Sequence, residues 1–144
     1  MESNTLRRGR LIDHILLVVE DFEASKNFYT AVLSALEIPV ITTANEYLLA
    51  DELVVASRRS PEAAWKLTGR HHLAFQARDR DMVDAFYHAA LTHCGRDNGA
   101  PGERHYHPGY YAAFVLDPQG NNIEAVYHGK AERSAGSVAI SFTQ

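Results

Sequence analysis

Two histidines and one glutamate carry side chains that could bind a metal ion together. His14, His72 and Glu124 each lie in a stretch of alternating apolar residues, a pattern that predicts β-strands. A carboxylate on the inner face of such a strand needs a partner, because burying it unpaired is costly. Two neutral imidazoles and a carboxylate suit a first-row divalent ion and leave coordination positions open. We therefore expect these residues to bind a divalent metal ion, namely Fe, Mn, Ni, Co or Zn.

The two histidines also occupy equivalent places in an internal repeat. Residues 14–33 align without a gap on residues 72–91, with six identities in twenty positions. The identical pairs are His14 and His72, Asp21 and Asp79, Phe28 and Phe86, Tyr29 and Tyr87, Ala31 and Ala89, and Leu33 and Leu91. Two modules related by a pseudo-twofold axis would place both imidazoles in one cavity, which strengthens the prediction of a shared metal site.

Each copy of the repeat begins as a predicted strand and continues as a predicted helix. The stretches 11–19 and 71–78 alternate, with the histidine on one face of each. Asp21 and Asp79 stand where an N-cap side chain accepts backbone N–H groups, and apolar residues then recur at helical spacing. Because a helix covers one face of each strand, we expect the histidine face to line the inside of a curved sheet.

Three further short strands are expected after each helix. In the first copy they cover 38–43, 46–50 and 53–58, and in the second 103–107, 110–116 and 121–128. The segment 94–102 is predicted to be a loop, and the sequence DPQG a hairpin turn. Alternation within 137–142 predicts an edge strand near the C-terminus.

These elements predict an α+β fold in which paired βαβββ modules form a cup-shaped mixed sheet, with the helices on its outer face. A chain of 144 residues suits one domain with a real core and is too short for two independent ones. We expect a single domain over 1–144. Its parts are module one at about 10–58, a linker at 59–70, module two at about 71–128 and a C-terminal tail at 129–144.

Composition argues against several classes of partner. The formal net charge is -4 and Lys and Arg form no large cluster, which disfavours nucleic acid and anionic membranes. No apolar run approaches the length of a membrane span, and the polar N-terminus lacks the apolar stretch of a signal peptide. The single cysteine, Cys94, excludes an intramolecular disulfide. We expect a cytoplasmic protein whose partner is a small-molecule substrate.

Three segments resemble the signature segments of the vicinal oxygen chelate superfamily, which includes glyoxalases, bleomycin-resistance proteins and extradiol dioxygenases. They are DHILLVVED with ASKNFYTAVL, HHLAFQARD, and FVLDPQGNNIEAVYH, and the match spans about residues 11–128. The resemblance implies a cup around a divalent metal with His14, His72 and Glu124 as ligands. It also implies a substrate that binds through two adjacent oxygens, and a homodimer, since such cups often form across two chains. Whether His14 meets His72 of its own chain stays open.

Extradiol ring-cleaving dioxygenases are similar to this chain in their ligand set of two histidines and one glutamate. Their last motif runs from a histidine through a tyrosine and a DPxG turn to the ligand glutamate. His107, the DPQG turn and Glu124 match that spacing, whereas Phe114 stands where the tyrosine belongs. Tyr110 or Tyr111 could supply the phenol, and we name His107 and Tyr110 as catalytic candidates, His107 as an acid/base. Alternatively, the segment HYHPGYY is simply the rim of the cup.

Other members of the superfamily supply alternative functions. Glyoxalase I-like lyases add a fourth ligand in the last strand of module one, where this chain has Val55 or Ala56. Fosfomycin thiol transferases are similar in the stretch IEAVYHG, but Leu16 and Phe114 stand where they place polar substrate contacts. Drug-binding proteins like the bleomycin-resistance proteins generally lack the three ligands. We therefore expect an extradiol-type dioxygenase first, and then a lyase, a thiol transferase or a non-catalytic binding protein.

Overall fold

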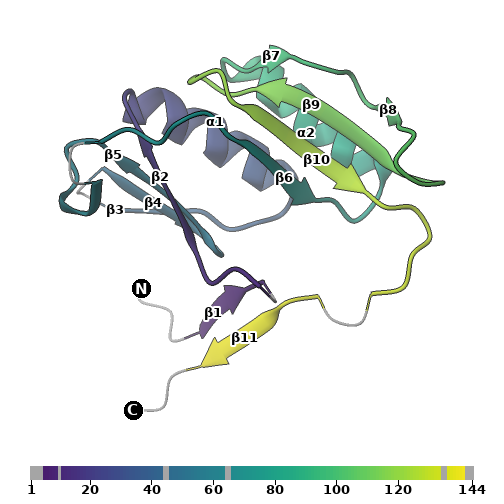
Figure 1. Ribbon diagram of the computed structural model, residues 1–144, viewed down its shortest axis with the longest axis horizontal. Coiled ribbons are helices and arrows are strands. Elements are labelled where there is room, and N and C mark those ends of the chain that lie inside the picture. The colour runs from purple at the N-terminus through teal and green to yellow at the C-terminus, as the bar shows by residue number, and fades with distance from the viewer. Residues whose placement is uncertain (1–4, 10, 44–45, 64–65, 134–135, 142–144) are drawn as a thin grey trace.

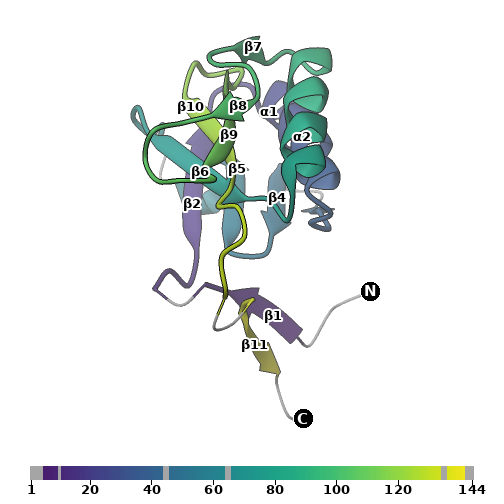
Figure 2. The same ribbon diagram turned by 90° about the vertical axis from the view of Figure 1, so that its right-hand side faces the viewer.

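Two β-sheets lie side by side, with both helices on one side of them, in the computed structural model of the chain (Figures 1 and 2). The structure describes residues 5–9, 11–43, 46–63, 66–133 and 136–141. Each sheet belongs to one module of the same plan, a strand followed by a helix and further strands. The expected α+β fold of paired βαβββ modules is confirmed, and the sheet faces turned away from the helices are left for a site.

The first module is made of β2 (Ile15–Val19), α1 (Phe22–Ala35), β3 (Ile41–Thr43), β4 (Tyr47–Ala50) and β5 (Leu53–Ser57). Its sheet has the order β2-β5-β4-β3, in which β2 and β5 are parallel and the other neighbours antiparallel. The helix begins after Asp21, whose side chain accepts a hydrogen bond from the Ala24 amide at 3.1 Å. Phe28 and Tyr29 of α1 are fully buried in the core, which fixes the helix against the sheet.

The second module is made of β6 (His72–Gln76), α2 (Arg80–Thr92), β7 (Arg96–Asp97), β8 (Gly102–Glu103), β9 (Tyr111–Leu116) and β10 (Asn122–Tyr127). Its sheet has the order β6-β10-β9-β7, with β8 also paired to β9. Asp79 caps α2 by accepting a hydrogen bond from the Met82 amide at 2.8 Å, as expected from the repeat. Neither α1 nor α2, nor any other helix in the described residues, is long and apolar enough to cross a membrane.

Two local predictions in the second module are wrong. The residues 104–110 form turns rather than the strand expected at 103–107, and the Tyr110 amide donates back to the His107 carbonyl at 3.2 Å. The Arg104 amide donates to the Tyr110 carbonyl at 2.9 Å, and Gly109, at φ 87°, lies within the loop that this hydrogen bond closes. The segment expected to be a loop contains the two-residue strand β7, which pairs with β9.

A buried hydrogen bond joins the two modules. The Tyr29 hydroxyl on α1 donates to Asp117 Oδ2 at 2.6 Å. Asp117 also accepts the amides of Gln119 and Asn121, at 3.0 and 2.9 Å, in the turn between β9 and β10. Hydrogen bonds to an ionised carboxylate are stronger than those between neutral groups. Asp117 therefore fixes α1 against the hairpin that carries Glu124.

The two ends of the described chain form a separate ribbon. β1 (Thr5–Arg8) pairs antiparallel with β11 (Val138–Ser141), so that Thr5 lies opposite Ser141. The ribbon extends away from the two sheets (Figures 1 and 2). The strand expected near the C-terminus therefore forms, but it pairs with the N-terminal segment instead of the edge of a main sheet. Phe142, which belonged to the predicted strand, lies outside the described residues.

Candidate metal site

Two of the three expected metal ligands lie on neighbouring strands of the second sheet. β6 and β10 are parallel, with His72 opposite Asn122 and Ala74 opposite Glu124. Because side chains alternate along a strand, His72 and Glu124 share the sheet face that points away from α2. Glu124 is only 3% exposed, whereas the His72 side chain is 45% exposed. A carboxylate this deeply buried requires partners that compensate for its lost hydration.

The main chain holds His72 in one tautomer. Its Nδ1 lies 2.9 Å from the Asn122 carbonyl oxygen, which can only accept, so Nδ1 carries the hydrogen. In a neutral imidazole Nε2 then bears a lone pair, and this atom faces Glu124 Oε1 at 3.0 Å. The lone pair and the carboxylate repel each other unless a proton or a metal ion lies between them. A backbone carbonyl on the second ring nitrogen is also the usual support of a metal-ligating histidine, so the donor set fits a divalent ion.

Tyr110 completes the surroundings of the buried carboxylate. Its hydroxyl donates a short hydrogen bond to Glu124 Oε2. Burial raises the pKa of Tyr110 above its ordinary value, and the hydrogen bond to Glu124 and the charge of that carboxylate raise the pKa further. Tyr111 donates instead to Asp84 on α2, at 2.8 Å, on the opposite face of the sheet. Of the two tyrosines that could supply a phenol, Tyr110 is therefore the one beside the candidate ligands.

His107 lies in a second cluster, which it forms with His128 and the Tyr110 ring. Its Nε2 is 2.8 Å from Nδ1 of His128, and its Nδ1 is 2.9 Å from the Pro108 carbonyl oxygen. The Tyr110 ring packs edge-on against both imidazoles, with centroid distances of 5.3 and 5.4 Å. Sequence reasoning gave His128 no role. The only signal was the alternation of the last strand, which puts His128 on the face of Glu124.

His14 lies apart from these residues within a single chain. β2 begins at Ile15, so the strand is shorter than expected and His14 precedes it. The His14 side chain is 59% exposed, and its Nδ1 contacts Asp13 Oδ1 at 2.7 Å. Within the described part of the chain, no three His, Cys, Asp or Glu side chains lie close enough together to hold a metal ion. One chain therefore brings together His72 and Glu124 but not His14.

The position equivalent to Glu124 in the first module is apolar. Leu16 corresponds to Ala74 in the repeat, and Leu16 lies opposite Val54 just as Ala74 lies opposite Glu124. Val54 is 5% exposed, whereas Val55 belongs to the core cluster under α1. By this register the position equivalent to Glu124 is Val54, rather than the expected Val55 or Ala56, and its side chain has no donor atom.

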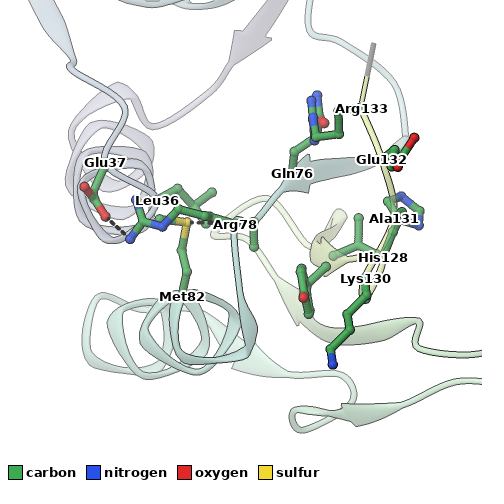
Figure 3. A pocket seen from close by; sticks show the side chains of 14 residues that line it. Leu36, Glu37, Gln76, Arg78, Met82, His128, Lys130, Ala131, Glu132 and Arg133 are labelled. Atoms are coloured by element: carbon green, nitrogen blue, oxygen red, sulfur yellow. Dashed lines mark hydrogen bonds and ion pairs between the residues drawn. The ribbon is translucent and has the colours of Figure 1, made fainter. Parts of the chain in front are cut away.

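A cavity of about 780 Å³ lies at the C-terminal ends of β6 and β10. Figure 3 shows Leu36, Arg78 and Met82 on one wall and the segment 128–133 on the other. The candidate metal ligands do not line it, but His128 does. His128 is therefore common to the cavity and to the second imidazole cluster. The volume lies within the range of small-molecule sites.

Comparison with known proteins identifies the family. The sequence model of the Glyoxalase/Bleomycin resistance protein/Dioxygenase superfamily matches residues 11–125. The crystal structure of a glyoxalase/bleomycin resistance protein from Albidiferax ferrireducens T118 is 26% identical, with a TM-score of 0.64, and covers 81% of this chain and 97% of that one. The crystal structure of a glyoxalase/bleomycin resistance protein/dioxygenase family enzyme from Burkholderia phytofirmans PsJN is 20% identical, with a TM-score of 0.61. It covers 79% of this chain and 95% of that one.

A solved enzyme of known name shares the fold. The crystal structure of lactoylglutathione lyase from Agrobacterium tumefaciens is 20% identical, with a TM-score of 0.55, and covers 81% of this chain and 92% of that one. At this identity the likeness shows a common fold and not a common reaction. No curated protein sequence matches the chain. The sequence match, the repeated modules and the shared fold agree, and the chain belongs to the glyoxalase/bleomycin resistance protein/dioxygenase superfamily.

Proposed function

We propose that the chain is a metal-dependent ring-cleaving dioxygenase of the extradiol type, acting on a small substrate with two adjacent oxygens. The proposal rests on the hydrogen bond from the Tyr110 hydroxyl to the Glu124 carboxylate, which lies next to His72. Extradiol-type members combine two histidines, a ligand glutamate and a phenol, and the arrangement here resembles that set. Phe114 occupies the expected place of the phenol, and Tyr110 supplies one from the preceding turn.

The proposed metal ligands are His72, Glu124 and His14. A divalent ion held there would supply a Lewis acid for the substrate oxygens and stabilise negative charge on them. Two neighbouring residues orient the donor atoms of His72 and Glu124. Asn122 fixes the tautomer of His72 so that Nε2 points toward Glu124, and Tyr110 holds the second carboxylate oxygen.

A homodimer is proposed to complete the site, with His14 supplied by a second copy of the chain. Leu11 and Ile12, just before His14, are 89% and 41% exposed, which leaves an apolar surface beside the missing ligand. Thr68 of the same chain already covers the β2 edge at Val18, so a second copy is proposed to pack on the exposed residues before β2 rather than along that edge. A second copy packed there would bury the apolar side chains and bring His14 to the other two ligands.

The apolar side chain of Val54 favours a dioxygenase over a glyoxalase I-like lyase. Such lyases resemble this chain in fold but add a fourth ligand in the first module, and Val54 stands at the place equivalent to Glu124. The two reactions also differ in their requirement for oxygen. Ring cleavage of a catechol consumes oxygen, whereas isomerisation of a hemithioacetal does not.

Oxygen uptake with a catechol tests the proposal. Protein loaded with Fe(II) or Mn(II) is expected to consume oxygen in proportion to the catechol cleaved. His72→Ala is expected to abolish oxygen uptake. His93→Ala is the control and is expected to leave uptake unchanged, because its side chain only bonds the Ala89 carbonyl at the end of α2. Oxygen-independent conversion of methylglyoxal hemithioacetal would replace the proposal with a lyase. Conversion of fosfomycin with a thiol, or metal-independent drug binding without turnover, would likewise overturn it.

A further inference from the structure

The main chain assigns the hydrogens of the His107 and His128 pair. The Pro108 carbonyl oxygen, 2.9 Å from His107 Nδ1, can only accept, so this nitrogen carries a hydrogen. In the neutral ring, His107 Nε2 then bears a lone pair and accepts a hydrogen bond from the Nδ1–H of His128 at 2.8 Å. The hydrogen on Nδ1 of His128 leaves a lone pair on its Nε2. Within the pair, His128 Nε2 is therefore the nitrogen whose lone pair is free to accept a proton.

Any added proton enters this pair at that nitrogen. Both ring nitrogens of His107 are engaged, whereas His128 Nε2 has no hydrogen-bond partner among the residues that the structure describes. When His128 Nε2 takes up a proton, the hydrogen bond to His107 stays in place. It also becomes stronger, because its donor is then charged. His107 thus orients His128 and supports the charge that develops on it.

We propose that His128 accepts a proton from the substrate and that His107 is the residue that positions it. The inference rests on the proposed function, because the substrate is a small molecule with an acidic hydroxyl next to a second oxygen. In this step the substrate O–H bond breaks and a bond forms between the proton and His128 Nε2. The electron pair stays on the substrate oxygen. The acid/base role expected for His107 passes to His128.

A close approach of two backbone segments holds the histidines together. Gly109 and Gly129 follow the two histidines closely, and both have positive φ, at 87° and 81°. A Cβ on Gly129 would lie 3.1 Å from the Cα of Gly109, and a Cβ on Gly109 would lie 3.3 Å from the Cα of Gly129. Larger residues would force these segments apart. The backbone therefore brings the side chains of His107 and His128 into contact.

His128 also lies where a substrate can reach it. It lines the cavity of about 780 Å³ (Figure 3), on the same wall as Lys130, Glu132 and Arg133. The two cations outnumber the one carboxylate on that wall, which favours the substrate anion left after proton transfer. The Tyr110 ring lies 5.4 Å from the His128 ring, and its hydroxyl donates to Glu124. Tyr110 therefore contacts both the proton acceptor and a proposed metal ligand, and a substrate that reaches His128 from the cavity must extend past this side chain to the metal site.

Long-range ¹H–¹⁵N NMR of histidine-labelled protein measures the tautomers and requires neither metal nor turnover. With the pair neutral, His128 is expected to carry its hydrogen on Nδ1 and none on Nε2. His107→Phe is expected to release His128 to the Nε2–H form that a free histidine prefers. His93 is the internal control, because the Ala89 carbonyl fixes its Nδ1–H in both proteins. A hydrogen on Nε2 of neutral His128 in the wild-type protein would overturn the inference.

The acceptor role is tested with 4-nitrocatechol, whose visible spectrum changes when it loses a proton. Wild-type protein loaded with metal is expected to bind it as an anion. His128→Gln is expected to bind metal normally but to ionise the bound probe less, and to turn over catechol about 10²-fold more slowly. Lys130→Gln is the control for a general effect of charge on the same wall.

The outcomes distinguish the two proposals. Unchanged ionisation of the bound probe in His128→Gln contradicts the role of His128 and leaves the proposed dioxygenase intact. Failure of the wild-type protein to bind the probe contradicts the proposed function, and the role of His128 falls with it. Restored ionisation in His107→Asn but not in His107→Phe supports positioning, because the asparagine side chain can still accept the Nδ1–H of His128.

Discussion

His72 Nε2 lies 3.0 Å from Glu124 Oε1, while the Asn122 carbonyl holds the other nitrogen of the same ring. The two side chains project from parallel strands, so the register of β6 and β10 sets their separation. Metal ligands are effective when the surrounding structure holds them within about 0.5 Å of their working geometry. A sheet supplies that rigidity better than a loop. Two of the three expected ligands are thus positioned by secondary structure.

Replacing Glu124 by glutamine is expected to weaken metal binding by more than about 100-fold, beyond the loss typical for an outer-shell partner. The fold is expected to survive, because glutamine can still accept from Tyr110 and donate to His72. Equilibrium dialysis with Mn(II) and thermal unfolding measure the two effects. Glu103→Gln, which removes an exposed ion pair with Arg80, is the matched control. Undiminished affinity in Glu124→Gln would exclude this site.

Mixing two variants tests whether His14 serves a second copy. His14→Ala and His72→Ala are each expected to lose metal and activity. If the site is shared, a dimer containing one chain of each kind has one intact site and one that lacks both histidines. Random mixing then restores about a quarter of the sites, because half of the dimers are mixed. Metal content after the two proteins are refolded together is the measurement. Mixed dimers with no recovery would place the site within one chain.

The hydrogen bond from Tyr29 to Asp117 is expected to make the fold sensitive to alkaline pH. Burial raises the pKa of Tyr29 well above its ordinary value, and the charge of Asp117 raises the pKa further. Because the folded-state pKa exceeds the unfolded one, this contribution to stability is complete below about pH 10. It is lost as pH rises from there towards the folded-state pKa. Urea unfolding at a series of pH values measures the loss.

Tyr29→Phe separates this effect from general alkaline unfolding. The variant is expected to lose about 1–3 kcal/mol of stability at neutral pH, because the buried Asp117 loses a donor. Its stability is also expected to fall less steeply above about pH 10. Tyr106→Phe changes a side chain on a residue that is 72% exposed and serves as the control. An alkaline fall as steep in Tyr29→Phe as in the wild-type protein would assign the sensitivity to other groups.

The sequence predicts those parts of the fold that depend on the spacing of apolar residues along a single strand or helix. Asp21 and Asp79 cap their helices as expected, because the change from a two-residue to a 3.6-residue period marks where each helix begins. The same alternation places Glu124 on the face of His72. In each case the relation depends on residues close in sequence, or on the register of neighbouring strands within one module.

Relations between distant segments could not be read from these periods. The repeat makes His14 equivalent to His72, but it does not say how two modules, or two chains, are placed relative to each other. The contact between His107 and His128 depends on a backbone turn that replaced a predicted strand. No apolar pattern encodes that turn, because it follows from Gly109 and its neighbours rather than from buried side chains.

Replacing Gly129 by alanine is expected to separate His107 from His128. An alanine at positive φ costs about 1–2 kcal/mol, and its Cβ would meet the Gly109 carbonyl oxygen at 3.1 Å. Backbone atoms must move to relieve that contact, so the turn that carries His107 shifts away. Gly69→Ala is the control, because a Cβ on Gly69 meets nothing within 4 Å.

Thermal unfolding and the NMR tautomer of His128 measure the two consequences of that substitution. A lower melting temperature alone follows from the strained alanine and does not report on the histidines. The tautomer decides, since His128 is expected to lose its fixed Nδ1–H once His107 moves away. A folded Gly129→Ala protein in which His128 keeps the hydrogen on Nδ1 would show that this backbone approach does not position the pair.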